Sequence, residues 1–118
     1  MQPARTGRIL RIHISEADRF QGKPLYEAIV AMCREMKIAG ATVFVGVEGY
    51  GATAEIHKSH IVRHDRPIVI MIVDTVEHLA RLIPAVEEMM DTGVIATSEV
   101  QMIRVEKTAA PGRPGAVP

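Results

Sequence analysis

The sequence is poor in the features on which several classes of protein depend. Among its 118 residues there is one cysteine, no tryptophan and only 3% aromatic side chains, while 14 basic residues balance 14 acidic ones. Few aromatic rings leave little for single-stranded bases to stack on, and a net charge of zero gives no long-range field that attracts a polyanion. We therefore expect no nucleic acid partner.

Two further absences concern the compartment. Cys33 is the only cysteine, so no intrachain disulfide can form, and a reducing, cytoplasmic location is expected. The longest apolar run, Ile68–Val73, is far shorter than the ~20 residues that a membrane-spanning helix needs. We expect no direct insertion into a membrane.

What remains is a chain rich in aliphatic residues. With 47% apolar residues it is long enough for one domain with one core. Alternating apolar and polar side chains predict a first strand over residues 8–15. Beyond Pro24, apolar residues at spacings of three and four predict a helix to about Ile38, which Gly40 ends in a left-handed conformation. Valines at every second position then predict a second strand over 43–47.

The rest of the chain predicts two more strands and a second helix. Ile68–Val73 is apolar on both parities, which indicates a central third strand. Asp74 is predicted as the N-cap of the second helix, which Pro84 either kinks or splits in two. A last strand is predicted over 94–105, with a break around Thr97–Glu99.

This order of elements predicts an α+β fold, a ferredoxin-like βαββαβ sandwich whose antiparallel sheet carries both helices on one face. The domain is expected over residues 8–105, after a flexible N-terminus (1–7) and before a disordered tail (106–118) rich in Ala, Pro and Gly. Self-association into a cyclic homo-oligomer would cover the free face of the sheet. That face is expected to expose Val69, Met71 and Val73.

Two motifs, in this order along the chain, carry a family resemblance. The first is Glu16-x-Asp18-x-x-x-Gly22-x-Pro24-Leu25-Tyr26. The second is Gly40-Ala41-Thr42-Val43-x-x-Gly46-x-x-Gly49-x-Gly51, followed by His57. Together they resemble the PII-like family known as domain of unknown function 190 (DUF190), over about residues 7–105.

The resemblance implies a function as well as a fold. Members look like distant relatives of the PII nitrogen regulatory proteins, which are ferredoxin-like trimers that bind adenine nucleotides in clefts between subunits. It also implies that residues 48–66 form the long loop that moves with ligand state and docks on a target such as a membrane transporter or an enzyme. PII proteins have a second, glycine-rich basic loop where this chain has only Asp91–Val94. The implied ligand is therefore AMP or ADP rather than ATP.

The candidate sites lie mostly in and beside this loop. Glycines lack the Cβ that disfavours positive φ, so they can turn backbone amides toward an anion, and their spacing here is not the dinucleotide-binding fingerprint. Guanidinium groups match phosphate oxygens. The predicted ligand-binding residues are Gly46, Glu48, Gly49, Gly51, Arg66 and Arg104. The residues predicted to contact a partner protein are Tyr50, His57, Lys58 and Arg63.

Catalysis and metal binding have weaker signals. His57, His60 and His64 have the spacing that would place three imidazoles on one helix face, yet no cysteine or carboxylate at ligand spacing accompanies them. No nucleophile elbow or phosphate-binding lysine motif is present, so we predict no metal site and no enzyme. Two alternatives to a nucleotide-sensing protein stay open: a histidine-loop metal-binding protein and an adaptor without a small ligand.

Overall fold

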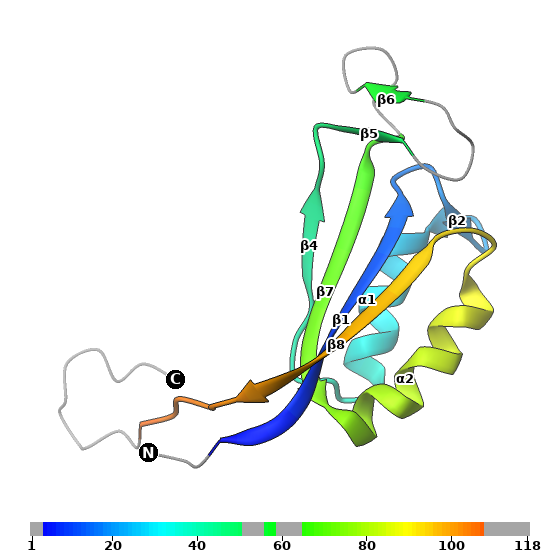
Figure 1. Cartoon of the computed structure of the whole chain (residues 1–118). Coiled ribbons are helices and arrows are strands. Elements are labelled where there is room, and N and C mark those ends of the chain that lie inside the picture. The colour runs from blue at the N-terminus through cyan, green and yellow to red at the C-terminus, as the bar shows by residue number, and fades with distance from the viewer. Residues whose placement is uncertain (1–3, 51–55, 59–64, 108–118) are drawn as a thin grey trace, which may run out of the picture.

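The structure, a computed structural model, describes residues 4–50, 56–58 and 65–107. These residues form one antiparallel sheet, two helices and two short hairpins (Figure 1). The elements are β1 (Arg5–Ser15), β2 (Arg19–Phe20), β3 (Lys23–Pro24), α1 (Leu25–Glu35), β4 (Thr42–Val45), β5 (Glu48–Tyr50), β6 (Ile56–Lys58), β7 (Pro67–Thr75), α2 (Val76–Met89) and β8 (Val94–Met102).

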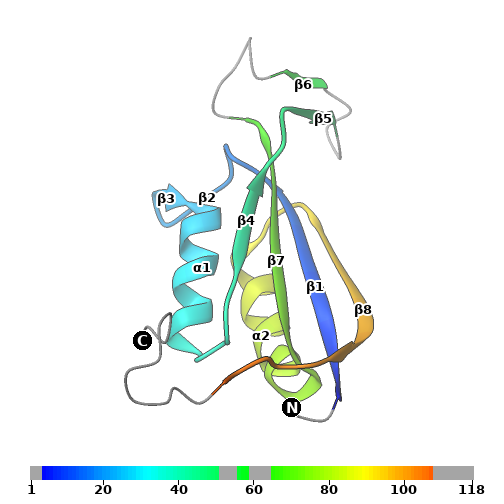
Figure 2. The same cartoon turned by 90° about the vertical axis from the view of Figure 1, so that its left-hand side faces the viewer.

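The main sheet has the strand order β4-β7-β1-β8, with every neighbouring pair antiparallel. This confirms the α+β ferredoxin-like prediction and the central place of the third predicted strand, which is β7. Both helices lie on one face of the sheet, and Figure 2 shows the other face without a covering helix. The predicted first strand begins three residues earlier than expected, at Arg5.

The core fills the space between the sheet and the helices. One parity of β1 and β7 points toward the helices, and this alternation is what the sequence predicted. The side chains that are less than 2% exposed are Leu10, Ile12, Leu25, Ile29, Ile68, Ile70, Ile72, Leu79, Leu82 and Val86. Cys33 belongs to the same cluster, and burial raises the pKa of its thiol to about 11.

The other parity forms the face that we call the open face. On β7 it consists of Val69, Met71 and Val73, as predicted, and Val73 is 43% exposed. Phe44 on β4 and Val94 on β8 extend it to both edges and are 48% and 60% exposed. A chain with this face in water exposes apolar surface that a partner could cover.

The predicted end of the first helix was wrong in detail. Lys37, with φ 61°, takes the left-handed position that had been assigned to Gly40, which is not among the positive-φ glycines of the described residues. The Ile38 amide donates to the Cys33 carbonyl (2.9 Å), and the Lys37 amide donates to that of Arg34 (3.1 Å), which is a Schellman ending. The burial of Ile38 beside Cys33 compensates for a non-glycine residue at this position.

Two other local predictions were wrong, and one of two alternatives for Pro84 is excluded. The N-cap of α2 is Thr75, not Asp74, because the Thr75 hydroxyl accepts from the His78 amide at 3.2 Å. Pro84 lies inside a single helix, so α2 is not split. β8 pairs with β1 without interruption from Val94 to Met102, so there is no break around residues 97–99. Pairing along a central strand keeps these polar residues extended.

Two hairpins were not predicted. β2 and β3 are joined by Gln21 and Gly22, both at positive φ, which is the two-residue turn that matches strand twist. β5 and β6 pair antiparallel within the predicted loop, with Gly49 opposite His57. No helix of the described residues is long and apolar enough to cross a membrane. Most of the predicted tail lies outside the described residues.

Candidate functional site

The predicted loop of residues 48–66 begins at a close backbone approach. The Gly46 amide donates to the Pro67 carbonyl at 2.7 Å, which holds the end of β4 against the start of β7. A Cβ at Gly46 would lie 2.7 Å from Pro67 Cγ, so this position needs glycine for space and not for a positive φ. This amide is already paired and is not available to a ligand. A ligand role for Gly46 remains a prediction, in which the absence of a side chain would let a ligand approach the backbone closely.

The loop is also held where it returns to the sheet. Arg66 Nε and Nη2 donate to Glu16 Oε1 and Oε2, both at 3.1 Å, in a two-pronged ion pair. The Glu16 amide donates to the Arg66 carbonyl at 2.8 Å. The hydrogen bonds and charge of Glu16 raise the pKa of Arg66. Arg66 was predicted to bind a ligand, and the structure shows its guanidinium paired with Glu16, the residue that follows β1.

Between these anchors the structure places only part of the predicted site. Glu48 is exposed at the start of β5, and the backbones of Gly49, Tyr50, His57 and Lys58 form the β5–β6 hairpin. The other predicted residues lie outside the described residues: Gly51, His60, Arg63 and His64. In the described part of the chain, no group of three or more His, Cys, Asp or Glu could hold a metal ion. The histidine cluster itself is therefore untested.

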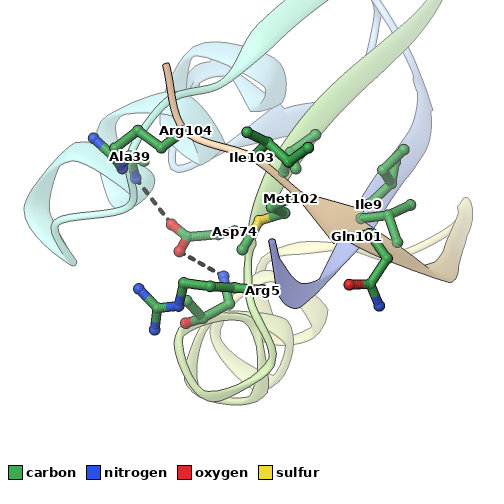
Figure 3. A pocket seen from close by; sticks show the side chains of 11 residues that line it. Arg5, Ile9, Ala39, Asp74, Gln101, Met102, Ile103 and Arg104 are labelled. Atoms are coloured by element: carbon green, nitrogen blue, oxygen red, sulfur yellow. Dashed lines mark hydrogen bonds between the residues drawn. The ribbon is translucent and has the colours of Figure 1, made fainter. Parts of the chain in front are cut away.

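A pocket of about 550 Å³ lies at the opposite end of the sheet. The chain that follows β8 crosses the end of the open face there (Figure 2). Its residues Ile103 and Arg104 line the pocket together with residues of β1 and β7. Figure 3 shows Arg104 and Arg5 on opposite sides of Asp74. The lining of the pocket thus combines apolar side chains with the charged side chains of Arg5, Asp74 and Arg104. Its lining includes Ile9, Val73, Val100 and Met102.

Asp74 organises this pocket. It is 6% exposed, and its carboxylate accepts from the Ala39 amide (3.0 Å) and the Thr75 amide (2.6 Å), while His78 Nδ1 lies 2.9 Å from it. Burial alone would raise the pKa of Asp74, but these hydrogen bonds outweigh burial and lower it. Asp74 therefore ties the link between α1 and β4 to the start of α2. Sequence reasoning missed this, although an Asp four residues before a His was a visible signal.

The described residues among those predicted to bind the ligand do not converge within one chain. Ser15 pairs with Pro67 at the end of the sheet where Gly46 and Arg66 lie, which we call the loop end. Arg5 pairs with Met102 at the other end, the pocket end, where Arg104 lies. A ligand that touched both Gly46 and Arg104 would need surfaces from two copies of the chain.

Comparisons with known proteins agree with the predicted resemblance. The family DUF190, described as an uncharacterized ACR, matches residues 7–102. A UPF0166 protein of Aquifex aeolicus is 36% identical over 98 residues, which cover 81% of this chain and 92% of that protein. A UPF0166 protein of Methanocaldococcus jannaschii is 30% identical over 104 residues, which cover 84% of this chain and 94% of that protein.

A solved structure shows the same fold. It is that of CPII from Thiomonas intermedia K12, described as a nitrogen regulatory PII-like protein and solved with ADP, AMP and bicarbonate. The two structures align with a TM-score of 0.64 at 18% identity, covering 86% of this chain and 92% of CPII. This likeness shows that the sheet and its two helices follow the PII-like arrangement.

Proposed function

Because the chain belongs to the DUF190 family and has a PII-like fold, we propose that it is a regulatory protein that forms a homotrimer and binds an adenine nucleotide between subunits. The observation that carries the proposal is the fold shared with CPII, whose structure holds ADP and AMP. AMP or ADP is the proposed ligand, because Asp91–Val94 supplies no basic phosphate loop. A cytoplasmic location follows from such a ligand.

The positions of the candidate residues support a site between copies. Gly46 and Arg104 lie at opposite ends of one sheet, so one chain cannot bring both to a small ligand. Arg104 is exposed and makes no ion pair with another described residue, which leaves its guanidinium available for phosphate. The exposed apolar side chains of the open face support an assembly that would place such surfaces side by side.

The loop of residues 48–66 is the proposed output. Its two ends are fixed to the sheet, by the Gly46–Pro67 hydrogen bond and by the Arg66–Glu16 ion pair. A nucleotide that contacts the loop in one conformation would favour that conformation, and a target enzyme or transporter would bind it selectively. The difference in nucleotide affinity between the loop conformations would thus shift the loop population toward the conformation that binds the nucleotide better.

Calorimetric titration with AMP, ADP, ATP and cyclic AMP tests the ligand. We expect AMP or ADP to bind, and Arg104→Ala to weaken binding by about tenfold or more, as for a lost charge-assisted hydrogen bond. Arg81→Ala is the matched control, since Arg81 is an exposed arginine of α2. Titrations without heat for all four nucleotides would overturn the nucleotide proposal.

Mixing two variants tests whether the site is shared. Gly49→Asp alters the loop side of the proposed site, and Arg104→Ala alters the other side. Each variant alone should bind the nucleotide at least about tenfold more weakly than the wild type, but reassembled mixtures should recover about a quarter of the sites at full affinity, because random assortment pairs one intact half with another. No recovery in mixed trimers would place both residues in a site within one chain or outside the site altogether.

A further inference from the structure

The open face combines apolar side chains with positive charge only. Its parity on the four strands of the main sheet follows from the strand register. Of the described residues on this face, Arg5, Arg11 and His13 are the only ones with a titratable side chain, and none is a carboxylate. The apolar residues around them include Ile9, Phe44, Val69, Met71, Val73, Val94, Ala96, Val100 and Met102.

Arg11 lies near the middle of this face. It belongs to the central strand β1, where Met71 and Ala96 are its neighbours on the two flanking strands. His13 follows on the same face, between Val69 and Val94. In the described part of the chain, no ion pair or side-chain hydrogen bond involves Arg11 or His13. The described residues of a single chain therefore offer the Arg11 guanidinium no partner.

Self-association through the open face would bring like charges from different copies close together. In a cyclic assembly whose copies all turn the open face toward the axis, residues near the middle of that face lie closest to the axis and approach their own counterparts. Copies of Arg11 would then be brought together on a surface without carboxylates. Burying like charges without a counterion is costly, whereas a guanidinium pairs strongly with the oxygens of an oxyanion.

We propose that self-association through the open face creates a binding site for a tetrahedral oxyanion, phosphate or sulfate, held by Arg11 of each copy with His13 beside it. This inference rests on the homotrimer of the proposed function but concerns a site separate from the nucleotide. The anion supplies the negative charge that the face lacks. It therefore stabilises the assembly and leaves the isolated chain unaffected.

The first experiment measures assembly by light scattering across a dilution series. Sodium sulfate and sodium phosphate are compared with sodium chloride at matched ionic strength. At an anion concentration about 100-fold above its dissociation constant, the association constant is expected to rise about 100-fold over the chloride reference. A response to one oxyanion and not the other identifies which is bound. Equal assembly in all three salts would overturn the inference.

Substitution of Arg11 gives the second readout. Arg11→Met removes both the repulsion between copies and the guanidinium that binds the anion. This variant should therefore assemble equally well with or without oxyanion. Arg11→Lys keeps the charge but loses the two-pronged geometry, and it should retain a weaker response. Arg81→Met, on α2, is the control and should respond like the wild type. An unchanged oxyanion response in Arg11→Met would place the anion elsewhere and overturn the assignment.

These outcomes separate the two proposals. A chain that stays monomeric in every salt contradicts the homotrimer itself, and the anion site with it. A stable oligomer that ignores oxyanions contradicts only the anion site. Nucleotide titration of Arg11→Met provides the cross-check, because its affinity for AMP or ADP should match that of the wild type. A large loss of nucleotide affinity would show that Arg11 serves the nucleotide site instead.

Discussion

The two faces of the same sheet are built from adjacent residues and have opposite roles. On β7, Ile70 is fully buried under the helices, while its neighbour Met71 lies on the open face. The covered face contains aliphatic side chains and, at its end, one buried carboxylate, Asp74. The open face contains apolar side chains and cations. One face therefore determines the fold, and the other is available to determine what the folded chain binds.

The difference shows why similar hydrophobicity does not mean similar function. Both faces are apolar enough to be buried, and a strand with apolar residues on both parities predicts cover on both sides. The covered side is satisfied within the chain by α1 and α2. On the open side, the described residues cover only one end, where the segment after β8 crosses it. Cover for the rest would have to come from outside this part of the chain.

The largest expected effect comes from substituting two neighbours on opposite faces. Ile70→Ala should lower the free energy of unfolding by about 2–5 kcal/mol, because it leaves a cavity in a closed core. Met71→Ala should change unfolding of the monomer much less and weaken assembly instead. Urea denaturation and light scattering distinguish the two results. Equal loss of stability in both variants, with assembly unchanged, would contradict the division of roles.

Asp74 is the one buried charged side chain among the described residues, and its role can be tested by substitution. Asp74→Asn should cost about 1–3 kcal/mol at neutral pH, because the amide cannot replace all acceptors of the carboxylate. The pKa of Asp74 is lowered from 3.8 in the folded chain, so its contribution is present above that value and is lost as pH falls through the folded pKa. The difference between wild type and variant should therefore shrink below about pH 4. A pH-independent difference would argue against this role of the charge.

Substitution of Gly46 tests the close contact with Pro67 at the point where β4 leads into the loop. Gly46→Ala should destabilise the chain by about 1–3 kcal/mol, because its Cβ would overlap the rigid ring of Pro67. Gly40→Ala is the matched control: apart from its chain neighbours, no atom of the described residues lies within 4 Å of the position of its Cβ, and the change should be neutral or slightly stabilising. Thermal unfolding measures both. Similar effects in the two variants would show that the contact with Pro67 is unimportant.

The smallest effect on stability is expected at the Arg66–Glu16 ion pair, because both side chains are partly exposed to solvent. Arg66→Ala should leave the melting temperature almost unchanged but speed hydrogen exchange of the Glu16 amide, which donates to the Arg66 carbonyl. Arg34→Ala, on α1, is a control that should leave this amide unaffected. Unchanged exchange in Arg66→Ala would show that the backbone alone anchors the loop.

Most of the fold could be predicted because it depends on periodicity. The alternation in β1 and β7 and the three-and-four spacing in the helices identify the covered face without any knowledge of tertiary contacts. Local endings were less predictable. Lys37, and not the nearby Gly40, adopts the left-handed conformation that ends α1, because this places the next residue, Ile38, in the core. Which residue becomes buried depends on the whole fold.

The candidate site was predictable only in part, because its residues act through contacts that the sequence does not show. Arg66 looked available for phosphate, but a carboxylate fifty positions earlier, Glu16, already pairs with it. Asp74 looked like a helix cap and instead links α2 to Ala39. The separation of Gly46 from Arg104 follows from the strand order, which no local motif encodes.

The lone thiol of the core provides a natural probe for these experiments. Because alkylating reagents attack the thiolate, and Cys33 is only 2% exposed with a pKa of about 11, the native chain should react very slowly at neutral pH. Each alkylation event then marks an opening that separates α1 from the sheet. Since the chain holds no second cysteine, mass spectrometry of labelled samples would time that opening, free or in the assembly, without any engineered tag.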